Sequence, residues 1–420
     1  MRILNVIRSV DPATGGPGEG LRQAVQAAQR LGHRHDVLTL DGPDHVWLGD
    51  WPGTIHALGP VRLDYGYTPA LVPWLKAHAG SFDAVIVHGL WQYHGLAVRR
   101  ALHGTAVPYF LYCHGMLDPW FKHAYPLKHL KKWLYWPWAD YRVARDAQTV
   151  LFTAEEERVL AAQSFWLYRA REAVVGYGLA LSPDAQAATA NDFLGLHRHL
   201  RGRRLLLFLS RLHEKKGCDL LIEAFAGVAG SDPHLHLVMA GPDAVGIRPA
   251  LQRLAQRLGV ADRITWTGML AGRAKWGAMR AAEVFVLPSH QENFGIAVAE
   301  ALAVGLPVLI SNRVNIWCEI VEAGAGFAEA DTLDGTVQLL RRWLTLEPER
   351  RAQMSACAVN CFRQHFHVDT AAGRLAQTLA TGIASARAGL APAARLPAPA
   401  VHRGAQERPT ASASDPGRSA

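Results

Sequence analysis

Short apolar runs that alternate with helical segments recur through the whole chain, and this alternation constrains the fold more than any other feature. Many of these runs end near glycine, proline or histidine, where a buried strand passes into a turn. Strands that alternate with helices predict parallel sheets with helices on both faces. Because 420 residues exceed what one core serves, we expect an α/β chain with two Rossmann-like, doubly wound domains. The strands are expected at residues 2–7, 36–40, 84–87, 108–112, 151–154, 205–209, 235–240, 264–268 and 284–287.

Changes in composition divide the chain into five parts. Residues 182–191 are small, polar and without periodicity, which is typical of a linker between domains. The last part is rich in Ala, Pro, Arg and Ser and also lacks periodicity, so we predict that it is disordered. The predicted parts are a first domain (1–180), a linker (181–200), a second domain (201–365), a final helix (366–385) and a disordered tail (386–420).

The stretch SHQENFGIAVAEALAVGLPV (289–308) carries the strongest chemical signal. A buried strand runs into a polar loop, and a helix then begins just after Gly295. A helix N-terminus offers free backbone N–H groups and a positive dipole end to an anion. Glu292 and Glu300 would repel a phosphate but could accept hydrogen bonds from sugar hydroxyls on either side of it. Hexose, diphosphate and ribose have this order in a nucleotide sugar.

This stretch resembles the E-x7-E signature of the retaining, nucleotide-sugar-dependent glycosyltransferases of family 4, which have the two-domain GT-B fold. The resemblance implies that two domains face each other across a cleft and that the C-terminal helix crosses back to the first domain. It also implies that Glu292 holds the donor sugar and that Glu300 holds the ribose. The backbone N–H groups of Asn293, Phe294 and Gly295 would then meet the diphosphate.

Two cations stand five residues apart around a turn that follows the strand at 205–209. The sequence SRLHEKKG resembles a family element in which an arginine and a lysine neutralise the diphosphate, and Arg211 and Lys216 match these positions, with Lys215 to spare. Fixed cations there would stabilise the charge that develops on the leaving group. The alternative is a solvated basic turn.

His114 follows the strand at 108–112, and the sequence HGMLDP resembles a turn found in a subset of the same family. In that subset the histidine reaches the donor sugar, so we expect His114 to contribute to catalysis with Glu292. The alternative is a histidine that only caps the end of a strand. We interpret His88, which ends the strand at 84–87, as such a structural residue.

Two further turns are expected to approach the donor. The glycine-rich sequence GGPGEG is predicted to form a loop before a helix that begins near Leu21. By the resemblance, Gly16 and Gly18 would line the cleft near the sugar and diphosphate, and Met269 and Leu270 would lie over the base. A tight turn without a ligand is the alternative for the glycines.

The segment 120–145 interleaves tryptophans with lysines and arginines. Aromatic and basic residues on one amphipathic segment are typical of a lipid interface, where indoles sit at headgroup level and lysines meet anionic phosphates. The alternative is an ordinary helix pair with core tryptophans and solvated lysines. The candidate membrane contacts are Trp120, Lys128, Lys131, Lys132, Trp133 and Trp136.

Composition limits the partners and the cofactors. The net charge of +8 lies partly in the tail, so it favours an anionic lipid surface or nucleotide sugar over nucleic acid. No two aspartates lie two residues apart, so the D-x-D metal element is absent and we expect no divalent metal or other cofactor. Five scattered cysteines and the absence of a signal peptide or an apolar span favour a cytoplasmic protein, which can be peripheral on the inner face of the plasma membrane.

The hypothesis is therefore retaining hexosyl transfer from a nucleoside diphosphate sugar to an acceptor hydroxyl. The aromatic-basic segment favours a lipid-linked saccharide acceptor in surface or exopolysaccharide assembly. A sugar-nucleotide epimerase of the same fold remains an alternative, although we find no acid/base carboxylates for it in the first domain. A glucan phosphorylase would need a pyridoxal-bearing lysine, for which there is no context. A non-catalytic nucleotide-sugar binding protein would not need His114 with Glu292.

Overall fold

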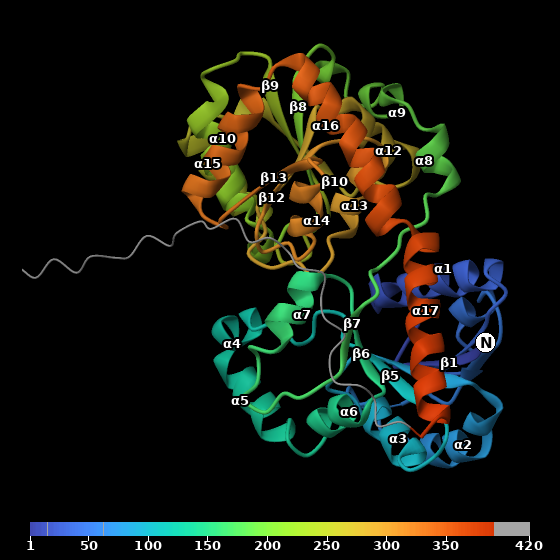
Figure 1. Cartoon of the computed structure of the whole chain (residues 1–420). Coiled ribbons are helices and arrows are strands. Elements are labelled where there is room, and N and C mark those ends of the chain that lie inside the picture. The colour runs from blue at the N-terminus through green and yellow to red at the C-terminus, as the bar shows by residue number, and fades with distance from the viewer. Residues whose placement is uncertain (15, 62, 390–420) are drawn as a thin grey trace, which may run out of the picture.

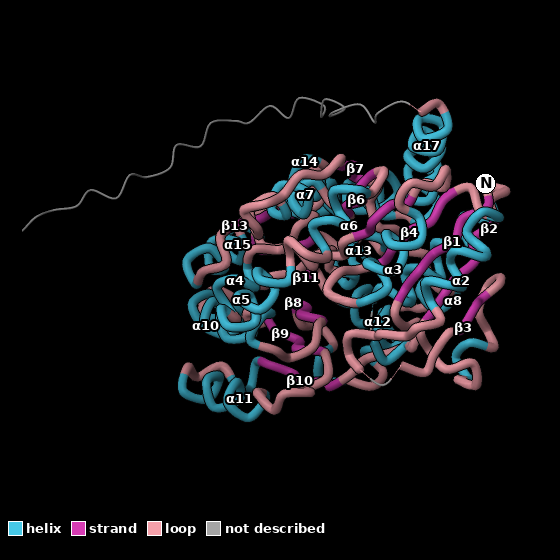
Figure 2. Tube along the Cα trace, turned by 90° about the horizontal axis from the view of Figure 1, so that it is seen from below, coloured by secondary structure: helices cyan, strands magenta, loops and turns pink. Residues whose placement is uncertain are grey.

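The structure is a computed structural model that describes residues 1–14, 16–61 and 63–389. Within these residues the chain forms two parallel β-sheets with helices on both faces, one above the other in Figure 1. Figure 2, viewed from below, shows the magenta strands surrounded by cyan helices. The predicted α/β fold with two doubly wound sheets is confirmed. The domain boundaries at 180 and 201 stay a prediction.

The first sheet contains seven described strands in the order β3-β2-β1-β4-β5-β6-β7. Every residue of β4 is buried, as expected of a strand covered by helices on both faces. The strands are β1 (Arg2–Ile7), β2 (Arg34–Thr39), β3 (Ile55–Ala57), β4 (Ala84–His88), β5 (Tyr109–Tyr112), β6 (Thr149–Phe152) and β7 (Glu172–Val174). The helices of this half are α1 (Gly16–Arg30), α2 (Leu71–His78), α3 (Tyr93–Leu102), α4 (Trp120–Ala124), α5 (Pro126–Tyr135), α6 (Asp140–Asp146) and α7 (Glu155–Ala161).

The second sheet contains six described strands in the order β10-β9-β8-β11-β12-β13. Its strands are β8 (Arg204–Leu209), β9 (Leu235–Ala240), β10 (Ile264–Gly268), β11 (Val284–Leu287), β12 (Val308–Ser311) and β13 (Gly326–Glu329). Its helices are α10 (Cys218–Ala229), α11 (Arg248–Arg257), α12 (Gly272–Ala281), α13 (Ile296–Ala303), α14 (Trp317–Glu322), α15 (Leu333–Leu344) and α16 (Pro348–Cys361).

Each sheet has one place where the order of its strands reverses. In the first sheet this switch lies between β1 and β4, and in the second it lies between β8 and β11. In open α/β sheets ligands bind outside the carboxyl ends of the strands at such a switch. The loops that follow these four strands are therefore where a site is expected.

The last helix, α17 (Val368–Arg387), belongs to the second half by sequence and packs on the first sheet (Figure 1). Leu379 and Ile383 join a buried cluster with Ile3 and Phe110. Gly382 allows the close approach, because a Cβ there would lie 2.6 Å from the Phe110 ring. The predicted crossing of the C-terminal helix back to the first domain is confirmed.

One local prediction is wrong. The glycines were expected in a loop before Leu21, but α1 already begins at Gly16 and contains them. The residues predicted to be a linker contain two short helices, α8 (Pro183–Ala187) and α9 (Ala190–Leu194). Local capping explains these helices, because Ser182 accepts from the N–H of Ala185 and Thr189 forms a capping box with Asp192.

The predicted disordered tail falls mostly on residues 390–420, which lie outside the described residues. Helix α17 reaches Arg387, two residues past the predicted end at 385. Among the helices that the structure describes, none has the length and apolar character that crossing a membrane would require.

Candidate functional site

A cavity of about 420 Å³ lies where the two halves face each other. The first half contributes side chains of α4, α5 and the turn between them. The second half contributes Arg211, Lys215 and Lys216 from the loop after β8, and Gln291 and Glu292 from the loop after β11. Both loops leave the sheet at its switch point, which is how residues far apart in sequence come to line one space.

The loop that carries Glu292 is held from both sides by backbone hydrogen bonds. The Glu292 N–H donates to the Arg313 carbonyl at 3.0 Å, and the Glu292 carbonyl accepts from the Asn315 N–H at 3.0 Å. Gly295 then turns the chain into α13 with a φ of 74°, in the left-handed region that favours glycine. The α13 N-terminus therefore opens beside a fixed carboxylate.

Each of the two predicted carboxylates is paired with a lysine. The Lys216 Nζ donates to Glu292, and the Lys275 Nζ donates to Glu300 at 2.7 Å. Lys275, on α12, was not predicted from the sequence, where it stands 25 residues before Glu300 in no recognisable motif. Glu300 is only 8% exposed, so its pairing offsets the cost of burying the charge.

Lys215, predicted only as a spare cation, connects the two halves. Its Nζ donates to the Gln291 side chain at 3.2 Å and lies 4.3 Å from the ring centroid of Trp120. Gln291 in turn donates to Asp118 of the first half at 3.1 Å. Arg211 is exposed and lines the cavity. Burial, together with the neighbouring Lys216 and Arg211, lowers the pKa of Lys215.

The N-termini of two helices meet across the halves. A Cβ built on Gly16, the first residue of α1, would lie 3.4 Å from the Cδ1 of Ile296, the first residue of α13. The Tyr177 hydroxyl donates to the Gly16 carbonyl at 2.8 Å. Gly18 is instead buried against Val10 within the first half. Of the two predicted glycines, only Gly16 is brought to the α13 N-terminus.

His114 follows β5 with a φ of 51°, which is uncommon for a non-glycine residue. Its ring stacks on Tyr112 with centroids 4.5 Å apart, and its Nε2 lies 3.0 Å from the His88 Nδ1. His88 also pairs with the Asn5 Oδ1 through its Nε2 at 3.1 Å. His114 keeps some exposed surface, yet burial of the ring lowers its pKa to about 4. His88 is thus connected to the site, which the sequence did not indicate.

A buried carboxylate supports the turn after His114. Glu157 accepts from the Gly115 N–H at 2.5 Å and from the Thr153 N–H and hydroxyl at 2.6 Å each. Asn293 donates to the same Thr153 hydroxyl at 3.2 Å, across the halves. Burial raises the pKa of Glu157. Glu157 also lies in the first turn of α7, where a favourable charge at a helix start already explains it, so its contact with this turn cannot be seen from the sequence.

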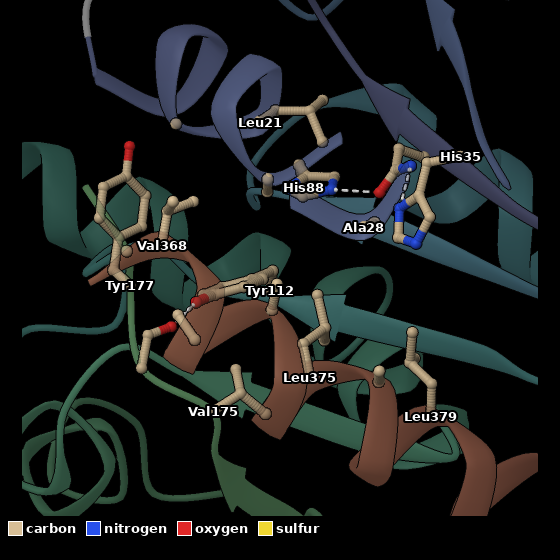
Figure 3. A pocket seen from close by; sticks show the side chains of 18 of the residues that line it. Leu21, Ala28, His35, His88, Tyr112, Val175, Tyr177, Val368, Leu375 and Leu379 are labelled. Carbon is tan, nitrogen blue, oxygen red and sulfur yellow. Dashed lines mark hydrogen bonds between the residues drawn. The ribbon is translucent and has the colours of Figure 1, made fainter. Parts of the chain in front are cut away.

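A second, smaller cavity of about 50 Å³ lies under α17 (Figure 3). Leu375 and Leu379 of α17 line one side, and the hydrogen bonds from His88 through Asn5 to His35 run along the other. A space of this size holds a water molecule or two and excludes a sugar. The interdomain cavity is the candidate substrate site.

Met269 and Leu270 follow β10, which lies at an edge of the second sheet. Met269 is 73% exposed, and Leu270 packs partly against the core. Their predicted position over the base stays a prediction.

The candidate membrane segment divides between several environments. Lys128 and Lys132 line the interdomain cavity, and Trp120 lies beneath Lys215. The prediction that Trp136 contacts lipid is wrong. Its side chain is fully buried, stacks on Phe165 and donates to the Leu167 carbonyl at 2.6 Å, as a core tryptophan does. Lys131 and Trp133 are exposed.

Within the described residues, no three His, Cys, Asp or Glu side chains gather in a way that could hold a metal ion. The expectation that no metal or other cofactor is needed stays a prediction.

Two family models match the chain in succession. The model described as Glycosyl transferase 4-like domain matches residues 15–178, and the model described as Glycosyl transferases group 1 matches residues 197–359. The first match covers most of the first sheet and the second covers the whole of the second sheet.

Curated relatives carry the name D-inositol 3-phosphate glycosyltransferase. The protein from Thermomonospora curvata is 38% identical over 170 residues, which is 38% of this chain and 38% of the relative's own length. The protein from Streptomyces avermitilis is 27% identical over 382 residues, which is 88% of this chain and 73% of the relative.

Solved structures share the fold. Sucrose-phosphate synthase from Thermosynechococcus elongatus aligns with a TM-score of 0.71 at 18% identity over 91% of this chain and 99% of that chain. Anabaena HepE in complex with UDP and glucose aligns with a TM-score of 0.67 at 21% identity, over 91% of this chain and 100% of that chain.

Proposed function

Because this chain belongs to the group 1 glycosyltransferases, we propose that it moves a hexosyl group from a nucleoside diphosphate sugar to an acceptor hydroxyl, with retention of anomeric configuration. The names of these relatives support sugar transfer. Because structural neighbours are in complex with UDP or UDP-glucose, a UDP-sugar is the donor to test first.

The observation that carries the proposal is a pair of carboxylate–lysine contacts, one before α13 and one on it. Lys216–Glu292 lies before the N-terminus of this helix, and Lys275–Glu300 lies on its first two turns. Carboxylates suit sugar hydroxyls, and the helix N-terminus between them suits a diphosphate. The N–H groups of Asn293, Phe294 and Gly295 would meet the diphosphate there.

Lys216 keeps hydrogen-bond donors in addition to the one that it uses on Glu292. An ammonium group has three N–H donors, so one bond to Glu292 leaves two for phosphate oxygens. Arg211, which is exposed in the same cavity, supplies a second cation. Both charges act most strongly on the diphosphate as it leaves, and so favour the transition state over the ground state.

In the proposed step the bond between the anomeric carbon and the diphosphate oxygen breaks, and its electron pair stays on the diphosphate. The acceptor oxygen forms its bond to the same face of the anomeric carbon. The acceptor proton passes to the departing phosphate oxygen, so no enzyme nucleophile and no divalent metal take part. Glu292 and His114 orient the donor sugar, and Glu300 holds the ribose.

The exposed face of α5 supports a peripheral position on an anionic membrane. Leu127, Leu130 and Leu134 are 82%, 55% and 60% exposed, and Lys131 stands among them. Apolar residues beside a lysine suit the boundary between headgroups and acyl chains. We therefore include in the proposal a lipid-linked saccharide acceptor at the inner face of the plasma membrane, used in surface or exopolysaccharide assembly.

A donor screen tests the reaction. Wild-type protein and the Glu292→Ala variant are incubated with UDP- and GDP-sugars plus EDTA, with and without a membrane extract, and nucleotide release is measured. The proposal is supported if the wild type releases nucleotide from one donor and the membrane extract stimulates this release. The release should be lost in the Glu292→Ala variant and unchanged by EDTA. Epimerised donor without transfer would instead identify an epimerase. Tight nucleotide binding without any turnover would identify a binding protein.

Sedimentation with vesicles tests the membrane part. Binding to vesicles that contain anionic phospholipid is expected to fall in a Leu127→Glu/Leu130→Glu double variant. The matched control is Leu196→Glu, because Leu196 is 70% exposed but lies outside α5. Equal losses in both variants, or equal binding to neutral vesicles, would contradict this part.

A further inference from the structure

The interdomain cavity is more cationic than one diphosphate requires. Of the described residues that line it, Lys128, Lys132, Arg211, Lys215 and Lys216 are cations, and Glu292 is the single carboxylate. Under the proposed function, Arg211 and Lys216 neutralise the donor diphosphate. Three lysines are then left without a counter-charge from the donor.

These three lysines also form no close ion pair. With the described residues as possible partners, no carboxylate lies within 4.0 Å of Lys128, Lys132 or Lys215. Asp140 attracts Lys132, and Asp118 and Glu292 attract Lys215, only from farther away. Their contacts are with aromatic rings and, for Lys215, with the uncharged Gln291. Lys132 and Lys215 are half-buried, whereas Lys128 is exposed. A charge that is partly removed from water without an ion pair costs free energy, which a bound anion would recover.

One aromatic ring brings two of the ammonium groups together from opposite halves. The Nζ of Lys132 lies 5.3 Å from the Phe121 ring centroid, and the Nζ of Lys215 lies 4.6 Å from it. Lys132 also lies 4.6 Å from the Trp91 ring centroid. Burial lowers the pKa of both lysines, and for each a neighbouring lysine adds to the effect.

Two of the lysines on α5 line the cavity and a third does not. Lys128 and Lys132 are four residues apart, so they lie close together on the helix, and both line the cavity. Lys131 is exposed and does not line it. The two lysines that line the cavity thus act on what enters it, and Lys131 acts on the outer surface.

We propose that Lys128, Lys132 and Lys215 form a second anion site, beside the donor diphosphate site, that binds a phosphate or diphosphate group carried by the acceptor. This inference rests on the proposed transfer reaction. A phosphate group carries up to two charges and three terminal oxygens. As a ligand for three ammonium groups it is therefore a better match than a carboxylate, which has one charge and two oxygens. The rings of Phe121 and Tyr125 in the same wall offer apolar surface to the rest of the acceptor.

The first test uses inorganic phosphate as the probe and UDP to fill the donor site. Calorimetry with saturating UDP present is expected to show phosphate binding to the wild type. Lys128→Gln and Lys132→Gln should weaken it about 10-fold or more each, since a hydrogen bond to a charged group contributes about 1.5–3 kcal/mol. Lys131→Gln, on the same helix, is the matched control and should bind as the wild type does. Sodium chloride at equal ionic strength controls for screening.

The outcomes separate this site from the proposed function. Failure to bind UDP would count against the nucleotide-sugar reaction itself. UDP binding without phosphate binding, or equal weakening by Lys131→Gln, would overturn the second anion site. A second arm compares glucose 6-phosphate with a polyprenyl diphosphate-linked glucose in detergent. The probe that binds more tightly than phosphate, with the same dependence on Lys132, identifies a soluble or a lipid-linked source.

Discussion

In the hydrogen bond between His114 and His88, His114 is the donor. The amide nitrogen of Asn5 faces the Asp36 carbonyl at 3.3 Å, so its oxygen faces the His88 Nε2, which must carry a hydrogen. Burial lowers the pKa of both histidines, so each ring is neutral and carries one hydrogen. The His88 Nδ1 therefore accepts from the His114 Nε2, at 3.0 Å. The Nδ1 of His114 therefore carries no hydrogen, and under the proposed function it accepts from a hydroxyl of the donor sugar.

We predict that nitrogen-15 NMR of the wild type shows His114 as the Nε2–H tautomer across pH 6 to 8. His88→Phe removes the acceptor and should lower kcat about 10-fold, because a neutral hydrogen bond is worth about 0.5–1.5 kcal/mol. His88→Asn offers a new acceptor and should recover part of the loss. A spectrum with the hydrogen on Nδ1 would contradict the proposed direction.

Glu300→Gln should weaken nucleotide binding about 10-fold or more, because a hydrogen bond from ribose to a charged carboxylate is lost and Lys275 is left without its partner. Calorimetry with UDP and with 2′,3′-dideoxy-UDP completes a double cycle. The wild type should bind 2′,3′-dideoxy-UDP more weakly than UDP, whereas the variant should bind the two nucleotides almost equally. Equal losses in both proteins would show that Glu300 does not contact the ribose.

Lys216→Met should lower kcat for nucleotide release by about 10²–10³, the range for removing one stabilising group of a developing anion. The donor KM should change less than kcat, because the charge that Lys216 meets grows as the bond breaks. Lys76→Met is the control, since Lys76 is an exposed lysine on α2. A rise in KM at unchanged kcat would show that Lys216 only helps the donor to bind.

The same substitution at two glycines of α17 should have opposite effects on stability. Gly373→Ala meets no atom within 4 Å and should raise the apparent unfolding temperature, because alanine favours a helix by about 1 kcal/mol over glycine. Gly382→Ala places a methyl group 2.6 Å from the Phe110 ring and should lower it, since overpacking costs about 1–3 kcal/mol. Thermal unfolding followed by circular dichroism measures both. Equal shifts would mean that α17 does not pack on the first sheet as described.

As the pH falls, a His94→Gln variant should lose less stability against unfolding than the wild type. Burial lowers the pKa of His94 to about 4, whereas the unfolded chain titrates near 6.5. Below pH 6.5 His94 binds a proton in the unfolded wild type but not in the folded protein. The free energy of unfolding therefore falls as the pH falls from 6.5 to about 4. The variant keeps a donor for the His88 carbonyl, which His94 contacts at 2.8 Å.

The difference in unfolding free energy between the variant and the wild type should change by about 1.4 kcal/mol per pH unit across this window, and level off above pH 6.5. The difference is the quantity to measure, because other buried groups titrate in the same window. Burial raises the pKa of Asp140 and Glu319 to about 7, so these acids stabilise both proteins as the pH falls and cancel in the difference. A constant difference from pH 7 to pH 4 would contradict the lowered pKa.

The fold could be predicted because its determinants are local. The residues of β11 are apolar in an unbroken run, and proline and then a polar loop end it within a few positions. The switch points follow from the strand order of two doubly wound sheets. The positions of Glu292 and Glu300 around Gly295 were therefore predictable from one stretch of sequence.

The partners of these residues were not predictable, because the chain brings them together only after folding. Lys216 and Glu292 are separated by 76 residues, and Gly115 and Glu157 by 42. No spacing rule connects such positions. Glu157 also sat in a run of three acidic residues that a helix start explains without any further contact.

The helix α5 illustrates a different limit. Its mixture of aromatic and basic residues was visible in the sequence, but which face meets the other half was not. Burial of Trp136 on Phe165 orients the end of the helix, and Phe165 belongs to a later segment. Composition therefore predicted an unusual surface and could not assign Lys128 and Lys132 to the cavity.

The crossing of α17 has a consequence for how the protein is made. The face of the first sheet that contains Ile3 and Phe110 is covered by Leu379 and Ile383, which are synthesised only after the strands of the second sheet. The first half therefore leaves the ribosome before the helix that covers this face has been made. Until α17 docks, the first half exposes an apolar surface that favours aggregation, and a chain that stops before α17 would keep this surface exposed. Maturation of the first half thus depends on the synthesis of α17.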